Sequence, residues 1–168
     1  AVQLHNRYGP TETAINVTHW HCQRTDGERS PIGRPLGNVL CRVLDEQFNL
    51  LPAGVPGELC IGGIGLARGY LGRAGLTAER FVPDPDDAAG GRLYRTGDWV
   101  RRNGLGQLLF AGRMDGQVKI RGYRVELAEI ESRVRELPGI RAAVVRVVGE
   151  GQAQQLAAYL VPVDAPHG

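Results

Sequence analysis

Three polar clusters, each joined to turn-forming glycines, contain the residue types that a nucleotide site needs. They occupy residues 6–12, 94–98 and 112–124. Tyr8 can present its ring to a base, because base–aromatic stacking contributes roughly 1–3 kcal/mol. Thr11 offers a hydroxyl to a phosphate oxygen, and Glu12 is an oxygen ligand suited to a magnesium ion held mainly by phosphates.

The second cluster and the start of the third add hydrogen-bonding groups of both signs. Asp98 can accept hydrogen bonds from both hydroxyls of a ribose, and Arg113 can donate to the same sugar or to phosphate. Each residue also fits a purely structural role: a Tyr-Gly-Pro turn, a turn aspartate or an arginine in solvent. The residue types alone leave both interpretations open.

The rest of the third cluster combines a small polar residue with a run of cations. Asp115 stands beside Gly116, a pairing that suits a swivel between two rigid bodies and equally suits an ordinary loop. Lys119, the only lysine in the chain, lies with Arg121 and Arg124 on an expected hairpin. That hairpin could approach a phosphate or a phosphopantetheine arm, or could be a charged strand in solvent. RNA binding is a weaker alternative, because Tyr123 is the only aromatic residue nearby.

The composition limits the class of protein. A chain of 168 residues with 42% hydrophobic residues supports one domain or slightly more, and a net charge of +2 gives no reason to expect nucleic-acid binding. Cys22, Cys41 and Cys60 have neither metal-site nor disulfide-framework spacing, so we expect buried thiols in a reducing cytoplasm. No apolar run is long enough to cross a membrane.

The pattern of strands and helices predicts an α+β fold. Short apolar runs separated by Pro and Gly, between residues 39 and 61, indicate a small sheet or barrel. A helical turn is expected at 77–80, and Asn103-Gly104 signals a hairpin. Helical spacing of apolar residues follows over 127–137, with strands at 140–148 and 156–163. The change of texture near Asp115 places a boundary there, between a β-rich part (1–114) and a small α+β part (115–168).

The clusters resemble, in order and wording, the core motifs of adenylation domains of nonribosomal peptide synthetases, within the adenylate-forming superfamily. The matching segments are residues 6–12, 57–71, 94–98 and 112–131, with 31–35 and 79–84 also similar to the family. The resemblance implies the distorted barrel-like end of the large adenylation subdomain, followed by an incomplete small subdomain.

The same resemblance implies a ligase-type enzyme of secondary-metabolite and antibiotic biosynthesis. Such enzymes use ATP and Mg²⁺ to form an aminoacyl-adenylate, and then pass the amino acid to phosphopantetheine on a carrier domain. Thr11 and Glu12 would take part in the chemistry, with Glu12 as the metal ligand. The residues implied to bind the nucleotide are Tyr8, Gly9, Thr11, Asp98, Phe110 and Arg113.

Further roles follow from the resemblance alone. Asp115 would be the hinge of the small subdomain, and the residues implied to meet the pantetheine arm are Lys119, Gly122 and Arg124. Arg7, Ile15 and Asn16 would line the amino-acid pocket, but these three do not fix which amino acid is activated. The implied partners are the amino acid, a peptidyl carrier domain, the rest of the adenylation domain and an MbtH-like protein.

The sequence departs from the family by omission. The phosphate-gripping loop belongs before residue 1, and the adenylation lysine belongs after residue 168; Lys119 occupies a different motif position. The sequence therefore assigns no catalytic residue with certainty. We expect little activity from the isolated chain, because adenylyl transfer needs positive charge placed around the phosphates. Two alternatives stay open: a non-catalytic or interrupted adenylation domain that docks a partner, and an acyl- or aryl-CoA ligase.

Overall fold

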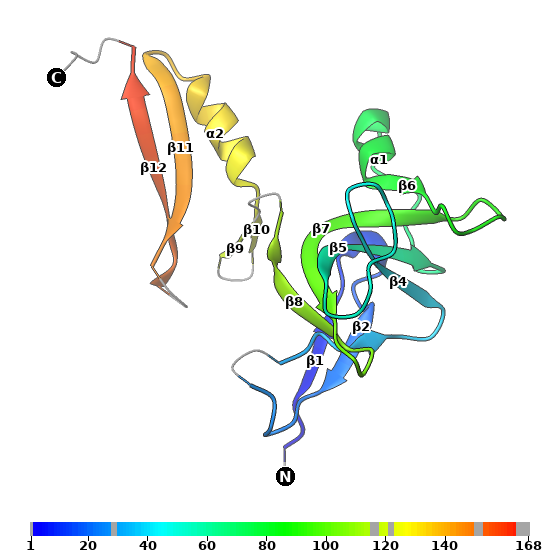
Figure 1. Cartoon of the computed structure of the whole chain (residues 1–168). Helices are drawn as coiled ribbons and strands as arrows, with labels where there is room; N and C mark the ends of the chain where they lie inside the picture. The colour runs from blue at the N-terminus through cyan, green and yellow to red at the C-terminus, as the bar shows by residue number, and fades with distance from the viewer. Residues whose placement is uncertain (1, 28–29, 115–117, 121–122, 150–152, 164–168) are drawn as a thin grey trace. The chain divides into compact units, whose positions relative to one another are not determined.

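The computed structural model describes residues 2–27, 30–114, 118–120, 123–149 and 153–163. The chain divides into two compact units, Ala1–Met114 and Asp115–Gly168 (Figure 1). Strands dominate and two α-helices accompany them, so the expected α+β fold class is confirmed. Neither of these helices has the length and apolar character that crossing a bilayer would require.

The first unit opens with a small antiparallel sheet. A short 3₁₀ helix, η1, follows its first strand directly after the Gly9-Pro10 turn. Gly33 links this sheet to the larger one through its pairing with Leu108. Its φ is +94°, and a Cβ there would lie 2.0 Å from the carbonyl oxygen of His19, so only glycine fits. The elements are β1 (His5–Tyr8), η1 (Thr11–Thr13), β2 (Thr18–His21) and β3 (Arg34–Pro35).

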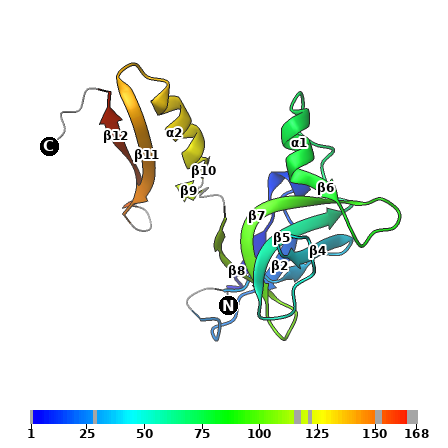
Figure 2. The ribbon, with the colours of Figure 1, turned by 45° about the horizontal axis from the view of Figure 1, so that its top comes forward.

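A five-stranded antiparallel sheet forms the body of the first unit. Its order is β4-β5-β7-β6, with β8 also paired to β7, and the long β7 curls strongly (Figures 1 and 2). The curl confirms the barrel-like character expected for this part. The strands are β4 (Val39–Leu44), β5 (Pro56–Gly63), β6 (Phe81–Pro83), β7 (Arg92–Arg102) and β8 (Leu108–Arg113).

The hydrophobic core lies against this sheet. Burial runs without interruption through residues 57–62 of β5, as expected for a central strand covered on both faces. The hairpin predicted at Asn103 is present, because Oδ1 of Asn103 accepts the N–H groups of Leu105 (3.0 Å) and Gln107 (2.9 Å). The helical turn expected at 77–80 belongs to a longer helix, α1 (Ala74–Arg80). The main core cluster consists of Val17, Ile32, Cys41, Val43, Leu59, Ile61, Val100 and Leu108.

The second unit combines one helix with two-stranded sheets. Its strands and helix agree closely with the expected ranges. Oε1 of Glu131 accepts the N–H of Val145 at 2.8 Å, so α2 lies along β11. β12 has a single neighbour in the described part of the chain, and its Tyr159 is 60% exposed. The elements are β9 (Val118–Ile120), β10 (Tyr123–Val125), α2 (Leu127–Arg135), β11 (Ile140–Val148) and β12 (Gln155–Pro162).

Candidate functional site

A bulge in β7 carries Asp98. Cys60 pairs with Arg95 and Glu58 pairs with Trp99, so three residues of β7 lie opposite Leu59 alone. Gly97, in the middle of the three, has a φ of +70°, a conformation that glycine adopts without strain. A bulge of this kind turns the strand locally and re-aims a side chain. Here the re-aimed side chain is the carboxylate of Asp98.

Two other strands, β1 and β8, bring side chains to that carboxylate. The Tyr8 hydroxyl, on β1, donates a hydrogen bond to Oδ2 of Asp98. Nη1 of Arg113, on β8, donates to Oδ1 at 2.5 Å, and Nη2 donates to the carbonyl of Thr96 at 3.1 Å. Asp98 is only 6% exposed. The geometry therefore unites three residues that the sequence analysis had selected separately.

The Tyr8 hydroxyl stays a donor in this arrangement. Burial, followed by the negative charge of Asp98, raises the pKa of Tyr8 above its ordinary value. Its ring packs against the hydrophobic core and is half-buried. The hydrogen bond to Asp98 was not foreseen, and the stacking of this ring on a base stays a prediction.

Glu12 lies in a second polar group of the same unit. Its Oε1 accepts a hydrogen bond from the Tyr70 hydroxyl at 2.7 Å, and its carbonyl accepts the N–H of Ala67 at 2.8 Å. Burial and the neighbouring Tyr94 and Glu12 raise the pKa of Tyr70, so its hydroxyl also remains protonated. Thr11, the adjacent predicted phosphate contact, is exposed.

Glu12 is the carboxylate that the sequence analysis predicted to hold a magnesium ion. Within the described ranges no group of three or more His, Cys, Asp or Glu side chains is arranged to hold a metal ion. Magnesium bound with a nucleotide needs only one or two carboxylates, because phosphates and water supply its other ligands. Glu12 with the exposed Thr11 beside it fits that requirement.

The residues predicted to line the amino-acid pocket are exposed. Arg7 lies on β1, whereas Ile15 and Asn16 lie in and directly after a strained turn in which Ala14 and Ile15 both have positive φ, 62° and 70°. Gly9 is packed beneath this turn, since a Cβ at Gly9 would lie 2.3 Å from the carbonyl oxygen of Ile15. The pocket role of Arg7, Ile15 and Asn16 stays a prediction. The predicted nucleotide contact of Phe110, which is exposed on β8, also stays a prediction.

The predicted hinge and carrier loop are described only in part. Asp115 and Gly122 lie outside the described residues. Lys119 and Arg124 are backbone partners in the antiparallel β9–β10 pair. Their predicted contact with a pantetheine arm remains untested.

Sequence reasoning missed the residues that hold the bulge. Glu58 is buried; its Oε1 accepts the N–H of Gly97 at 3.0 Å, and its Oε2 accepts Nε (3.0 Å) and Nη2 (2.7 Å) of Arg95. The sequence contained one sign of this arrangement: Glu58 is a charged residue within an apolar strand, and a buried charge must be paired.

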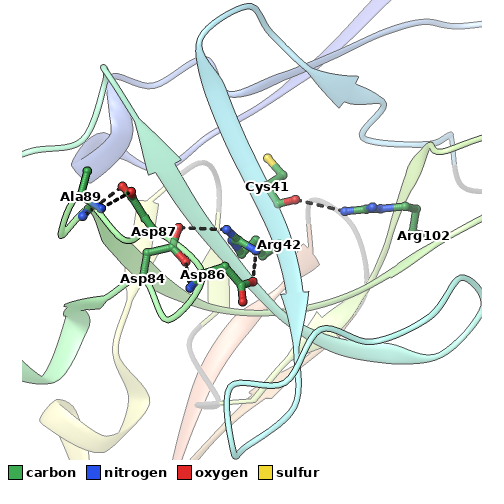
Figure 3. Close-up of polar contacts among 8 residues, drawn as sticks. Cys41, Arg42, Asp84, Asp86, Asp87, Ala89 and Arg102 are labelled. Atoms are coloured by element: carbon green, nitrogen blue, oxygen red, sulfur yellow. Dashed lines mark hydrogen bonds and ion pairs between the residues drawn. The ribbon is translucent and has the colours of Figure 1, made fainter.

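A second buried carboxylate–arginine pair lies in the same sheet (Figure 3). Asp84 accepts Nη2 of Arg42 at 3.2 Å and the N–H of Asp86 at 3.0 Å, while Nη1 of Arg42 binds the Asp86 carboxylate. Asp84 is buried, although Asp86 and Asp87 in the same loop are exposed. A hollow of about 440 Å³ borders this loop, lined in part by Leu40, Leu66 and Arg92.

Comparison with known proteins identifies the class. Residues 1–71 match the family model of the AMP-binding enzymes. The chain is 55% identical over 163 residues to phosphinothricin tripeptide synthetase PhsB of Streptomyces viridochromogenes, covering 96% of this chain and 14% of PhsB. It is also 49% identical over 164 residues to tyrocidine synthase 3 of Brevibacillus parabrevis, covering 95% of this chain and 2% of that protein.

Solved structures agree with this assignment. PA1221, a nonribosomal peptide synthetase protein containing adenylation and PCP domains, matches with a TM-score of 0.84 and 35% identity, over 98% of this chain and 34% of PA1221. IdnL1 matches with a TM-score of 0.87 and 33% identity, over 99% of this chain and 34% of IdnL1. The chain belongs to the AMP-binding, adenylate-forming family. It corresponds to a C-terminal part of a nonribosomal peptide synthetase adenylation domain.

Proposed function

We propose that this chain provides the nucleotide-binding face of an adenylation domain that activates an amino acid. The reaction joins the amino-acid carboxylate to the α-phosphate of ATP, forming an aminoacyl-adenylate and releasing pyrophosphate. The observation that supports it most directly is the meeting of Tyr8, Asp98 and Arg113, from three strands, at one carboxylate.

In this proposal Asp98 recognises the ribose. Each carboxylate oxygen has two lone pairs and can accept more than one hydrogen bond, and the two ribose hydroxyls would donate to these oxygens. Arg113 holds the carboxylate in place before the nucleotide arrives. Because the pair is already formed, binding needs little rearrangement of these groups.

Thr11 and Glu12 would act at the phosphates. The exposed Thr11 hydroxyl would donate to the α-phosphate. Glu12, oriented by Tyr70, would be the ligand of Mg²⁺, which when bound neutralises phosphate charge. The Tyr8 ring, together with Gly9 and Phe110, would form the face for adenine.

The transfer step would involve the second unit and a partner. We propose that Asp115 is the hinge between a large subdomain (1–114) and a small one, and that the segment with Lys119, Gly122 and Arg124 meets the phosphopantetheine of a carrier domain. The PCP domain that accompanies adenylation in PA1221 supports this partner. An MbtH-like protein is a further proposed partner, and the free thiols fit the cytoplasm as compartment.

The peptide-synthetase branch is preferred over an acyl- or aryl-CoA ligase. Both named relatives, PhsB at 55% identity and tyrocidine synthase 3 at 49%, are nonribosomal peptide synthetases. Arg7, Ile15 and Asn16 would contribute to the amino-acid pocket.

Binding of a non-hydrolysable aminoacyl-adenylate mimic tests the proposal. We expect the chain to bind a sulfamoyl-adenosine mimic and Asp98→Ala to weaken binding roughly 100-fold, because two ribose hydrogen bonds to a charged acceptor are lost. Asp86→Ala, which removes an exposed carboxylate elsewhere, is the matched control. Equal binding by wild type and Asp98→Ala would exclude the ribose role.

Catalysis is measured separately by pyrophosphate–ATP exchange. We expect the chain alone to show little exchange, because Lys119 is the only lysine in its sequence and occupies a different motif position from the adenylation lysine. Robust exchange by these 168 residues would contradict that expectation and would exclude a merely non-catalytic role.

A further inference from the structure

The bulge that presents Asp98 needs an acceptor outside the strand ladder. Gly97 is buried, and as one of three residues opposite Leu59 it has no paired residue on β5. A buried N–H without an acceptor costs about 1–3 kcal/mol. Oε1 of Glu58 supplies the acceptor, at 3.0 Å.

The side chain of Glu58 is itself held in place by Arg95. Arg95 donates two hydrogen bonds to its other oxygen, and the guanidinium of Arg95 lies over the ring of Phe48, 5.4 Å from the centroid. The forked geometry of arginine fixes the direction of a carboxylate as well as its charge. The carboxylate of Glu58 therefore has one orientation, and that orientation faces Gly97.

The next peptide group, between Gly97 and Asp98, is connected to both members of the ribose site. The N–H of Asp98, the next residue, donates to Oγ1 of Thr96 at 3.0 Å, and that hydroxyl donates to the carbonyl of Leu59 at 2.7 Å. The carbonyl of Gly97 accepts the N–H of Met114 at 2.9 Å, directly after Arg113. Fixing Gly97 thus fixes the backbone on both sides of the Asp98–Arg113 pair.

We propose that Glu58 is a positioning residue for ribose recognition, acting through Gly97 to hold Asp98 and Arg113 in register. This role rests on the proposed nucleotide function. Glu58 does not touch the nucleotide in this arrangement. An apolar residue at this position would pack in the strand but would leave Gly97 and Arg95 without their acceptor.

The test compares two nucleotides that differ only at the ribose hydroxyls. Affinities for AMP and 2′,3′-dideoxy-AMP are measured by calorimetry with the full chain. We expect wild type to prefer AMP by at least about tenfold, and Glu58→Gln to reduce that preference to about twofold, since misplacing Asp98 removes charge-assisted hydrogen bonds.

The matched control is Asp84→Asn. Asp84 is also buried, pairs with an arginine and accepts a backbone N–H, but it has no hydrogen bond in the Asp98 bulge. We expect it to lower the melting temperature and to keep the wild-type preference for AMP. Equal loss of preference in both variants would mean general loosening of the sheet and would overturn the proposal.

The remaining outcomes distinguish the role of Glu58 from the ribose role of Asp98. Wild type with no preference for AMP would overturn the ribose role of Asp98 and the nucleotide site with it. A wild-type preference retained in folded Glu58→Gln would overturn the role of Glu58 alone. If Glu58→Gln does not fold, Arg95→Lys replaces it. Arg95→Lys keeps the charge but loses the fork, and an undiminished preference there would likewise overturn the proposal.

Discussion

Two buried carboxylate–arginine pairs in one sheet differ in what their backbone hydrogen bond holds. Glu58 accepts the N–H of Gly97, at the centre of the bulge that carries Asp98. Asp84 accepts the N–H of Asp86, two residues ahead in its own loop (Figure 3). The first pair therefore joins two strands at a candidate binding site, whereas the second closes a local turn.

The comparison shows that a buried ion pair is not informative by itself. Burying two charges costs free energy that their attraction offsets only with good geometry and full hydrogen bonding. Both carboxylates accept hydrogen bonds from an arginine and from a backbone N–H, although Nε of Arg42 is buried without a hydrogen-bond partner among the described residues. Burial and pairing alone therefore do not distinguish the roles of the two pairs. The position of the N–H group that each carboxylate holds does.

Removing either carboxylate gives the largest expected effect on stability. Glu58→Ala should lower the free energy of unfolding by roughly 3 kcal/mol, at the low end for a broken buried pair because Arg95 is partly exposed. Asp84→Ala should lower it by roughly 1–2 kcal/mol, because Arg42 keeps Asp86 as a partner. Urea unfolding followed by fluorescence of Trp20 and Trp99 measures both. Equal losses would contradict the distinction.

Alkaline pH tests the two buried thiols of this sheet, Cys41 and Cys60. Burial raises the pKa of Cys41 and of Cys60 to about 12 from an ordinary 9.0, and the charges of Glu58 and Asp84 add to the rise at Cys60. Below pH 9 both folded and unfolded thiols are neutral. Between pH 9 and 12 only the unfolded chain loses these protons, so stability should fall as the pH rises, by roughly 1–2 kcal/mol per thiol near pH 10.5.

Urea unfolding at pH 8 and 10.5 measures this effect. The double variant Cys41→Ala/Cys60→Ala should show a shallower fall than wild type. Glu58→Gln should lower the pKa of Cys60 more than Asp84→Asn does, as followed by site-resolved alkylation. A parallel fall in wild type and double variant would assign the pH dependence to other groups.

Tyr8→Phe should have a smaller effect, confined to the Asp98 region. It removes one hydrogen bond to a charged acceptor, and we expect a loss of about 1.5 kcal/mol in stability. Tyr159→Phe, which removes a hydroxyl from an exposed residue, is the control and should change stability by less than about 0.5 kcal/mol. The same unfolding measurement compares the two.

The smallest expected effect is at Asp86. Its carboxylate is mostly exposed, so Asp86→Asn should change stability by no more than about 0.5 kcal/mol. A loss as large as that of Asp84→Ala would show that the loop depends on both of its ion pairs.

Local patterns in the sequence predicted much of this fold. Asn103-Gly104 marked the β7–β8 hairpin, and apolar residues at helical spacing after Leu127 marked α2 within two residues of its end. These signals act between near neighbours and depend on turn chemistry and periodicity. The residue types of the candidate site were also visible, because Tyr8, Asp98 and Arg113 stand in glycine-containing motifs.

The contacts between those residues could not be predicted from the sequence. Tyr8 and Asp98 are ninety positions apart, and their contact depends on the register of strands that no local pattern sets. The bulge at Gly97 is an irregularity in pairing with β5, so its dependence on Glu58 appears only once that pairing is known. A lone charge in an apolar strand showed that a partner must exist, but not which residue it was.

The outer strand of the second unit has a practical consequence for handling the protein. β12 leaves Leu156, Tyr159 and Leu160 exposed, and it has only β11 as a neighbour in the part of the chain that the structure describes. Open, apolar strands are templates for intermolecular pairing and aggregation. We therefore expect this strand, and not the sheet that carries Asp98, to set the highest concentration at which the purified chain can be stored.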